Sequence, residues 1–321
     1  MVRGLINKYN ELSSSNKHIT KMLKKLIDKN NFTLINVSQL ISNKGSLKKY
    51  LVDTYGNIPE YYITFNNIGS HCEIIDELSC ILKIICIVDD IHHLKSVRNP
   101  RIKVFQKSYY ILNTYAYVFN YYKFPNMNNN IFFPHSTRHL IHFNYKPINK
   151  ILISGTIVER VYPNRYYMSQ LAKTDKRLHI LNPSDNIVGK KYFKTLGKYI
   201  ACFVDDSRNY ILAKFFEIPA SGSLLLAMNT NTKKILESLG FMDGINYISC
   251  SKENINEKID FITNPNNINH INNIRLQGYN LIKSKHKWRK RYHDFLKLLD
   301  SSDNLPIRHD NDFNSNYRQY F

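Results

Sequence analysis

Short apolar runs alternate with amphipathic segments through the second half of this 321-residue chain, and this alternation constrains the fold more than any other feature. We predict strands over five apolar runs, at residues 150–154, 178–181, 199–204, 223–227 and 247–250. Helices are predicted at 208–218, 232–239, 252–262 and 267–299. Because strands that alternate with helices form parallel βαβ units with right-handed crossovers, the pattern predicts an α/β fold built on a parallel sheet.

The first half of the chain shows a less regular alternation. Basic helices are predicted over residues 5–30, a further helix over 104–116, and extended segments at 32–37, 61–65, 83–88 and 117–120. A polar, turn-rich stretch then precedes Pro134 and Pro147, and it marks a domain boundary. We therefore predict an N-terminal domain over residues 1–140, a C-terminal domain over 141–300 and a polar tail over 301–321.

The chain carries 45 basic and 25 acidic residues, which gives a net charge of +20. Such a surplus attracts anionic partners: nucleic acid, an anionic membrane face or a phosphorylated small molecule. The abundance of Asn, Ile, Lys and Tyr offers another explanation, since AT-rich coding produces the same bias. Charge alone therefore does not choose among these partners.

Cysteine usage and hydropathy indicate a cytoplasmic protein. The five cysteines form no Cys-x-x-Cys pair, and Cys86, Cys202 and Cys250 lie in or beside apolar runs, as reduced thiols do in the cytosol. The N-terminus lacks an apolar stretch of signal-peptide length, and no run approaches the ~20 apolar residues that span a bilayer. We expect no transmembrane segment.

The first predicted strand of the second half ends in a small-residue turn that contains Gly155 and Thr156. Ligands of open α/β sheets bind at the carboxyl ends of the strands, and a glycine turn before a helix lets the backbone approach a phosphate. Arg160 and Arg165 follow, and a guanidinium group matches a diphosphate in shape. The alternative is that both are surface arginines. A dinucleotide oxidoreductase and a P-loop enzyme are disfavoured, because both of their glycine motifs are missing.

A second candidate site begins with Lys214 and Glu217, near the end of a predicted helix, and continues into a tight turn over Ser221, Gly222 and Ser223. The Glu217 carboxylate, in an otherwise apolar stretch, is suited to accept hydrogen bonds from a ribose diol. Lys214, one helical turn earlier, is suited to meet a phosphate. The alternative is a surface ion pair between the two at i, i+3 spacing.

A third candidate site follows a predicted strand in the first half, with the sequence Asp89-Asp90-Ile91-His92-His93. Two acids and two histidines suggest a metal site. Neighbouring side chains on a strand point to opposite faces, however, so they cannot all reach one ion, and we predict no metal. We expect Asp90 or His92 to contact the donor or the acceptor; the alternative is an aspartate that caps the next helix.

These motifs together resemble the GT-B glycosyltransferases, in particular the group similar to the spore maturation protein CgeB. Residues 214–226 resemble the Lys-x-Phe-Glu-x-x-Ala-x-Gly stretch of that family, and residues 153–165 resemble its strand, glycine turn and Tyr-Pro-x-Arg segment. Residues 286–291 match a His, an aromatic residue and an Arg before the last helix, and residues 89–92 resemble a strand end in relatives from large DNA viruses. The resemblance covers about residues 60–300.

The resemblance implies a GT-B fold, in which two Rossmann-like domains with parallel sheets face an interdomain cleft. The nucleotide-sugar donor would bind mainly to the C-terminal domain and the acceptor to the N-terminal one. Glu217 would then hold the ribose, Arg165 and Lys214 the diphosphate, and residues Ser221 to Ser223 the donor loop.

The resemblance also implies that no metal or other cofactor is needed, because basic side chains and helix dipoles neutralise the leaving diphosphate. Many retaining members carry a first glutamate eight residues before the one that matches Glu217. Here that position is Asn209, and this departure bears on the donor-sugar contacts and on the retaining assignment. Asn209 is counted among the predicted donor-site residues.

The sequence therefore predicts a metal-independent glycosyltransferase that moves a sugar from a nucleoside-diphosphate donor, such as a UDP-sugar, to a glycan, protein or other acceptor. One alternative is a nucleic-acid-binding protein, which the charge and the 23 tyrosines would suit, although no nucleic-acid-binding module is recognisable. A glycosyltransferase acting on a DNA base would combine both features. A further alternative is a GT-B domain that has lost catalysis and acts as a binding protein, as Asn209 suggests.

Overall fold

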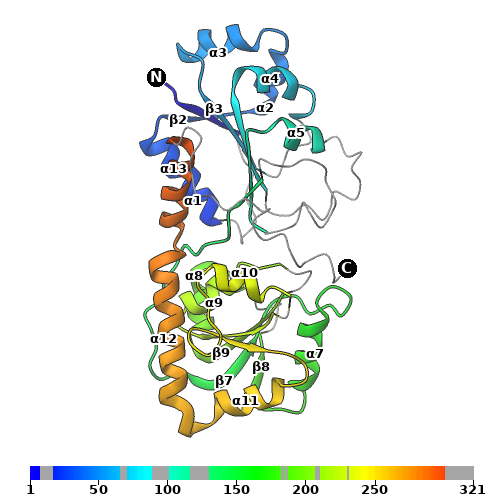
Figure 1. The fold of residues 1–321 in the computed structure, drawn as a ribbon, viewed down its shortest axis with the longest axis vertical. Helices are drawn as coiled ribbons and strands as arrows, with labels where there is room; N and C mark the ends of the chain where they lie inside the picture. Colours follow the sequence, from blue (N-terminus) through cyan, green and yellow to red (C-terminus); the bar gives the residue numbers. More distant parts are fainter. Residues whose placement is uncertain are drawn as a thin grey trace. The chain divides into compact units, whose positions relative to one another are not determined.

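The computed structural model describes residues 1–7, 17–65, 71–88, 101–115, 130–181, 185, 187–206, 210–229 and 231–300 (Figure 1). The chain divides into two compact units, one of Met1–Pro134 with Asp294–Phe321 and one of His135–His293. The boundary therefore follows residue 134 instead of the expected 140, and residues 294–300 join the first unit instead of the C-terminal domain. The predicted tail lies outside the described residues. Within these ranges, no helix combines the length and the hydropathy of a membrane span.

The first unit is built on a six-stranded parallel sheet in the order β2-β1-β3-β4-β5-β6. Its strands are β1 (Gly4–Asn7), β2 (Phe32–Ile35), β3 (Tyr61–Phe65), β4 (Lys83–Val88), β5 (Tyr110–Asn113) and β6 (Asn130–Phe132). Its described helices include α1 (Lys17–Lys29), α2 (Val37–Ser42), α3 (Leu47–Tyr55), α4 (Ile75–Ile81) and α5 (Arg101–Lys107).

Two helix predictions for this unit are wrong in part. Residues 5–30 contain β1 as well as α1, and residues 104–116 contain β5 after the end of α5. Both strands have only four residues, which is too short for apolar periodicity to separate a strand from a helix. They become strands because parallel neighbours on both sides complete their backbone hydrogen bonds. The predicted strand at 117–120 lies outside the described residues.

The last helix, α13 (Trp288–Asp300), starts in the second unit and ends in the first. Its Phe295 ring lies edge-on to Phe133, with centroids 6.4 Å apart. The Tyr61 hydroxyl donates to the Leu299 carbonyl at 2.6 Å, and Arg3 pairs with Asp300 at 2.6 Å. These long-range contacts explain why the end of this helix belongs to the first unit.

The second unit is built on a five-stranded parallel sheet in the order β11-β10-β9-β7-β8. Its strands are β7 (Ile148–Ile153), β8 (Leu178–Ile180), β9 (Tyr199–Asp205), β10 (Leu224–Met228) and β11 (Ile248–Cys250). Its helices are α7 (Pro163–Leu171), α8 (Gly189–Leu196), α9 (Lys214–Ala220), α10 (Lys233–Ser238), α11 (Ile255–Thr263), the short η5 (Pro265–Asn267), α12 (Ile268–Lys285) and the start of α13.

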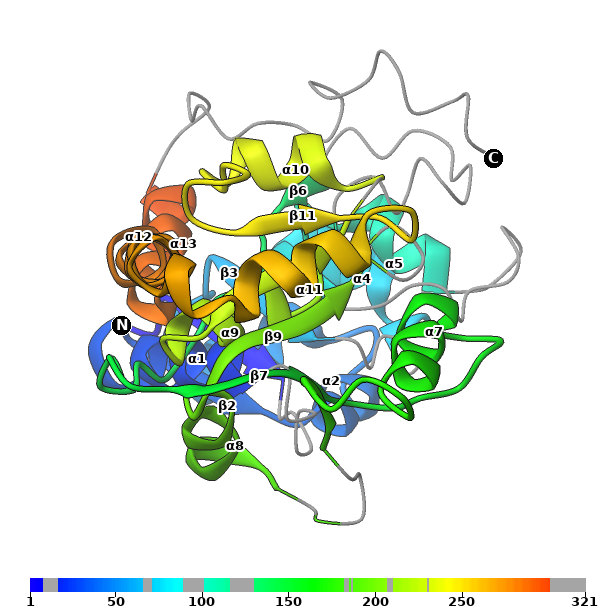
Figure 2. The ribbon, with the colours of Figure 1, turned by 90° about the horizontal axis from the view of Figure 1, so that it is seen from below.

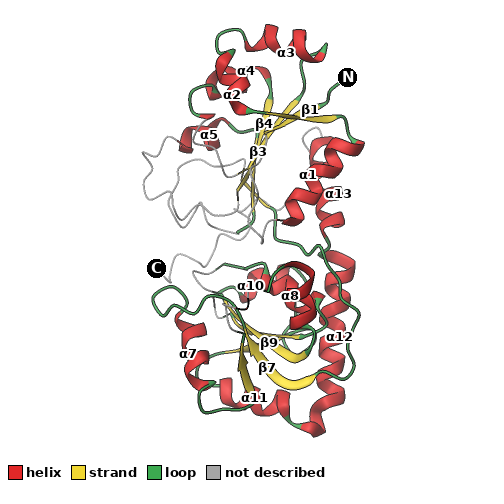
Figure 3. Cartoon of the chain, turned by 180° about the vertical axis from the view of Figure 1, so that it is seen from behind, coloured by secondary structure: helices red, strands yellow, loops and turns green. Residues whose placement is uncertain are grey.

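The helix predicted over residues 267–299 is two helices, because α12 ends before His286 and α13 begins at Trp288 (Figure 3). The His286 ring stacks on Phe241 at 5.9 Å, and its Nε2 atom lies 2.8 Å from the Leu239 carbonyl oxygen. These contacts hold His286 in a non-helical conformation. The helix predicted from residue 208 begins as α9 at Lys214.

Helices cover both faces of the second sheet, so its central strands are buried throughout. Helices α7 and α11 pack on the face that carries Phe203, in an apolar core with β7 and β10. Helix α8 lies on the opposite face, where the Cys202 thiol approaches the Leu196 carbonyl. Figure 2 shows α11 and α8 on opposite sides of β9. Burial on both faces explains why β9 and β10 are continuous apolar runs instead of alternating ones.

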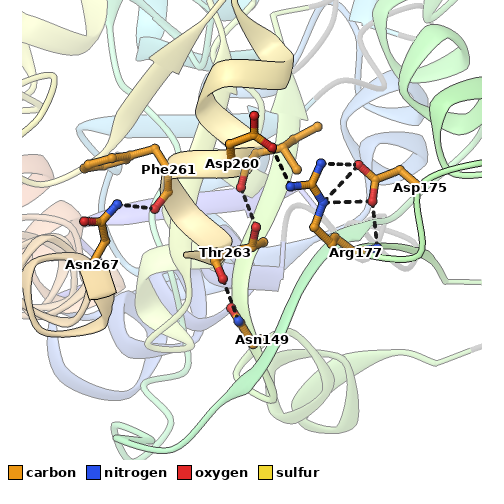
Figure 4. Close-up of polar contacts among 8 residues, drawn as sticks. Asn149, Asp175, Arg177, Asp260, Phe261, Thr263 and Asn267 are labelled. Atoms are coloured by element: carbon orange, nitrogen blue, oxygen red, sulfur yellow. Dashed lines mark hydrogen bonds and ion pairs between the residues drawn. The ribbon is translucent and has the colours of Figure 1, made fainter. Parts of the chain in front are cut away.

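Polar contacts tie together the amino edge of this sheet, where its parallel strands begin (Figure 4). Arg177, just before β8, pairs with Asp175 at 2.8 Å and also with Asp260 of α11. The Asn149 amide donates to the Thr263 carbonyl at 2.8 Å, which joins β7 to the end of α11. The carboxylate of Asp260 is well exposed, so its ion pair with Arg177 is solvent-screened and contributes little to stability.

The strand order creates a switch point between β7 and β9. From β7 the chain places the next strand, β8, on one side and then places β9 on the other. Loops that leave two such strands diverge, and the crevice at their carboxyl ends is where ligands bind in sheets of this kind. Residues that follow Ile153 and Val204 therefore lie at the expected binding position.

Candidate functional site

Gly155 forms the turn at the carboxyl end of β7, directly at the switch point. Its φ of +95° is a conformation that other residues rarely adopt. A Cβ at this position would overlap the Lys214 ammonium group and lie 3.3 Å from a terminal nitrogen of Arg165. The backbone conformation therefore favours glycine here, and any side chain at this position would displace the Lys214 ammonium group.

Arg165, in the first turn of α7, is a buried residue that joins three elements. Its Nη1 atom donates to the Thr156 carbonyl at 2.9 Å, and its Nη2 atom donates to the Asp205 carboxylate at the end of β9 at 2.7 Å. The guanidinium group also lies over the Tyr162 ring, 4.2 Å from its centroid. Arg165 is thus not a surface arginine: it holds the glycine turn against β9, and Asp205 neutralises much of its charge.

Lys214, the first residue of α9, extends its ammonium group to the same turn. The Nζ atom donates to the Ser154 carbonyl and lies 3.3 Å from the Ser154 hydroxyl. Desolvation lowers the Lys214 pKa to about 7, with a further contribution from Arg165, while Glu217 and Asp205 act in the opposite direction. Near neutral pH this group therefore exchanges between its charged and neutral forms.

Glu217 lies one helical turn after Lys214 and is partly exposed. The predicted alternative of a Lys214–Glu217 surface ion pair is wrong, because the Lys214 ammonium points to Ser154. Among the described residues, no donor hydrogen-bonds the Glu217 carboxylate. Desolvation raises its pKa, and the positive charges of Lys214 and Arg138 oppose that rise. A desolvated carboxylate without a donor is suited to a ligand that supplies hydroxyl groups.

Two residues of this site were not predicted from the sequence. Tyr192 of α8 places its hydroxyl 3.2 Å from the Ser154 hydroxyl, and burial followed by the charge of Glu217 raises its pKa. The positive charge of Arg138, in the irregular segment between β6 and β7, acts to lower the Glu217 pKa. Neither residue belongs to a recognisable local motif, so no signal in the sequence could have identified it.

Two acidic residues end β9, and this strand-end pair was a signal that the sequence contained. Asp205 is the partner of Arg165. The Asp206 carboxylate accepts hydrogen bonds from the Asn231 backbone at 3.1 Å and from the Thr232 hydroxyl at 3.2 Å. Burial raises the Asp206 pKa to about 6. Asp206 therefore holds the turn that precedes α10, next to the carboxyl end of β10.

The structure does not bring Ser221, Gly222 and Ser223 to this site, which corrects the expected donor loop. They precede β10 and so lie at the amino edge of the parallel sheet, opposite Gly155. Both serines are fully buried, and their hydroxyls donate to the carbonyls of Ile218 at 2.6 Å and Tyr199 at 3.0 Å. The direction of α9, which runs from the carboxyl edge to the amino edge, separates them from Lys214.

The remaining predicted site residues either are exposed near the Gly155 turn or lie outside the described residues. Thr156 is exposed in the turn and offers its carbonyl to Arg165, and Arg160 is exposed in the loop before α7. Asp90, His92 and Asn209 lie outside the described residues. Within the ranges that the structure covers, no three His, Cys, Asp or Glu side chains are grouped as a metal site requires.

Neither a family model nor a curated protein sequence matches this chain. Solved structures do match its fold. Anabaena Alr3699/HepE, in complex with UDP and glucose, has a TM-score of 0.61 at 8% identity, with 94% of this chain and 100% of that chain covered. A glycosyltransferase from Rickettsia africae ESF-5 has a TM-score of 0.57 at 11% identity, with 94% and 100% covered. TarM has a TM-score of 0.55 at 13% identity, with 80% and 58% covered.

At these identities the similarity shows the fold. The expected GT-B fold, with a Rossmann-like parallel sheet in each of two units, is confirmed. This chain spans the whole length of the Anabaena and Rickettsia proteins but little more than half of TarM. The predicted relation to the CgeB-like group stays a prediction.

Proposed function

We propose that the protein is a glycosyltransferase of the CgeB-like group, and that the carboxyl edge of the second sheet binds the diphosphate of a nucleotide-sugar donor. The observation that carries this proposal is the packing of the Lys214 ammonium group against the Gly155 turn. A backbone without a Cβ and a desolvated cation meet at the switch point, where sheets of this kind bind their ligands.

Lys214 and Arg165 take different roles in this proposal. Arg165 is committed to Thr156 and Asp205, so it shapes the turn. Lys214 supplies the positive charge that neutralises the phosphate, because a diphosphate beside its Nζ atom favours the protonated form of the side chain. As the glycosidic bond breaks, negative charge builds up on the leaving diphosphate, and a fixed cation at that position stabilises it. This role requires no metal ion.

Glu217 is the proposed partner of the ribose. Its carboxylate lies one helical turn from Lys214, and no described group donates a hydrogen bond to it. Vicinal ribose hydroxyls would supply the missing donors. UDP-sugars are the first donors to test, because the similar Anabaena protein was solved with UDP and glucose and with UDP-glucose.

The proposal is tested by incubating the protein with UDP-, GDP- and dTDP-sugars and measuring release of the nucleoside diphosphate, with and without EDTA. We expect slow release from one donor, unaffected by EDTA and reduced about tenfold or more in Lys214→Gln and Glu217→Ala. Lys198→Gln is the control, because it removes one exposed lysine from the same unit.

Release that persists in both variants would place the donor site elsewhere. No release and no thermal stabilisation by any nucleotide would favour the alternatives, a nucleic-acid-binding protein or a GT-B protein without catalysis.

A further inference from the structure

Helix α8 presents lysine side chains on its outer face. Phe193 and Leu196 are buried on the side that packs on β9 and α9, whereas Lys190, Lys191 and Lys194 are exposed. Residues four apart lie on the same side of a helix, so Lys190 and Lys194 are one turn apart and Lys191 lies beside them. Figure 2 shows α8 on the outer side of the second sheet. The helix therefore exposes one basic face.

The segment that precedes β7 lies beside the end of α8 and extends this basic face. The Asn144 side-chain amide donates to the Gly197 carbonyl at 3.4 Å, and the Ile148 N–H donates to the Lys198 carbonyl at 2.7 Å. Lys146 lies between these two anchored residues, and its side chain is exposed. The two segments therefore form one continuous surface of the second unit.

Positive charge on this surface has no acidic partner. No Asp or Glu occurs in residues 135–158 or in residues 186–204. Within the described part of the chain, the exposed lysines of these two ranges form no ion pair. On the opposite face of the sheet, by contrast, Lys258 of α11 pairs with Glu257 at 3.0 Å, and Arg177 has two carboxylate partners. The lysines of the α8 surface therefore remain available to an anionic partner.

The lysines alternate along the chain with large apolar side chains that are also exposed. Val188, directly before α8, is 58% exposed. Tyr145 is 63% exposed and Ile148 is 48% exposed, on either side of Lys146. Apolar side chains that gather in one exposed region mark an interaction site instead of a merely solvated face. The partner of this surface must therefore offer both negative charge and an apolar layer.

An anionic lipid bilayer offers both. Each lysine near an anionic leaflet strengthens binding about fivefold, and aliphatic side chains insert at the boundary between headgroups and acyl chains. Tyrosine is enriched at this level of the membrane, which suits Tyr145. Single-stranded nucleic acid, the other extended anionic partner, is bound by aromatic stacking, which Ile148 and Val188 cannot supply. The exposed aliphatic residues therefore favour the bilayer.

We propose that α8 and the segment before β7 form a docking surface for an anionic lipid bilayer. The lysines supply the electrostatic attraction, and the apolar side chains supply shallow insertion. The inference goes beyond the proposed function and does not rest on it, because the side chains of the docking surface are not those of the proposed donor site. The docking surface consists of Lys146, Lys190, Lys191 and Lys194 with Tyr145, Ile148 and Val188.

The test is co-sedimentation of the full chain with lipid vesicles at about 0.05 M and about 0.5 M salt. One set of vesicles is pure phosphatidylcholine, and in the other about a third of the lipid is phosphatidylserine. Circular dichroism confirms that each variant is folded. The variants are a lysine variant, Lys190→Gln/Lys191→Gln/Lys194→Gln, and an apolar variant, Tyr145→Ser/Val188→Ser.

A third variant is the matched control for charge. It removes three exposed lysines that adjoin α7 and α11, on the opposite face of the sheet, and so changes the net charge by the same amount as the lysine variant. It carries Lys173→Gln, Lys176→Gln and Lys252→Gln.

We expect the wild type to bind the vesicles that contain phosphatidylserine and not those of pure phosphatidylcholine, and to bind more weakly at the higher salt concentration. The lysine variant should bind about a hundredfold more weakly, since three lysines contribute about fivefold each. The apolar variant should lose about tenfold. The control variant should stay within about threefold of the wild type, because its lysines do not face the bilayer.

Three results would overturn the inference. If the wild type did not bind vesicles that contain phosphatidylserine, the surface would not be a membrane site. If the lysine variant and the control variant lost affinity equally, binding would depend on net charge alone. If an oligonucleotide displaced the wild type from the vesicles, and the apolar variant bound vesicles as the wild type does, the surface would instead bind nucleic acid.

Discussion

The ammonium group of Lys214 occupies the space that a side chain on Gly155 would need. These residues are brought together because β7 and β9 are neighbours and α9 starts at their carboxyl edge. Two predicted features of the sequence, a glycine turn and a basic residue expected near the end of a helix, thereby become one site, and the basic residue is the first residue of α9.

Substitution of Gly155 should separate backbone strain from loss of the site. Gly155→Ala forces alanine into a positive φ and displaces the Lys214 ammonium, so we expect a loss of about 1–2 kcal/mol of stability and at least a tenfold loss of nucleotide affinity. Gly244→Ala is the matched control, because Gly244 also has a positive φ (75°) but no atom within 4 Å of its Cβ position. Chemical denaturation would measure the stability of each variant, and calorimetry would measure its nucleotide affinity. Equal affinities in the two variants would show that the turn does not bind the ligand.

Lys214 should make the stability of the protein depend on pH above neutrality. The folded state releases this proton near pH 7, whereas the unfolded chain holds it up to the ordinary lysine pKa of 10.5. Unfolding therefore takes up a proton between these values, and the free energy of unfolding rises with pH. Compared with Lys214→Gln, the free energy of unfolding of the wild type should rise by at most about 1.4 kcal/mol for each pH unit. The rise should be smaller than this limit, because the Lys214 side chain is partly exposed to solvent. Urea unfolding of both proteins at pH 7 and pH 9 measures this difference. If the free energy of unfolding changed equally with pH in the wild type and in Lys214→Gln, the lowered pKa of Lys214 would be contradicted.

The buried pair between Arg165 and Asp205 should contribute strongly to stability. Asp205→Ala leaves a buried guanidinium group without its acidic partner, so we expect a loss of about 3 kcal/mol or more. Glu257→Ala is the comparison, because it removes an exposed pair with Lys258 and should cost less than about 1 kcal/mol. Equal denaturation midpoints for both variants would show that Arg165 finds another partner.

Arg177 should matter for the amino edge of the second sheet and not for ligand binding. Arg177→Ala removes exposed ion pairs with Asp175 and Asp260, so we expect a loss of about 1 kcal/mol or less. Nucleotide affinity should match the wild type, because Arg177 precedes β8 at the amino edge of the sheet whereas Gly155 follows β7 at the carboxyl edge. A loss of affinity as large as that of Lys214→Gln would argue against the carboxyl edge as the binding site.

The strands of the second sheet and the glycine turn could be predicted from the amino-acid sequence. The strands are continuous apolar runs because helices bury both faces of the sheet, and such runs are visible without a structure. Gly155 and Lys214 could be proposed for the same reason: each belongs to a local pattern, at the end of a strand or near the end of a predicted helix. Short elements such as β1 were not predicted, because four residues show too little periodicity to distinguish a strand from a helix.

Which of these residues come into contact depends on the three-dimensional fold. Strand order places Asp205 beside the Gly155 turn, although β8 lies between them in the chain, and the direction of α9 moves Ser221 and Ser223 to the far edge. The break between α12 and α13 anchors Thr137, although it lies more than 140 residues later in the chain. Local patterns reflect which faces of an element are buried, whereas contacts between distant segments depend on strand order and helix direction, which no local pattern encodes.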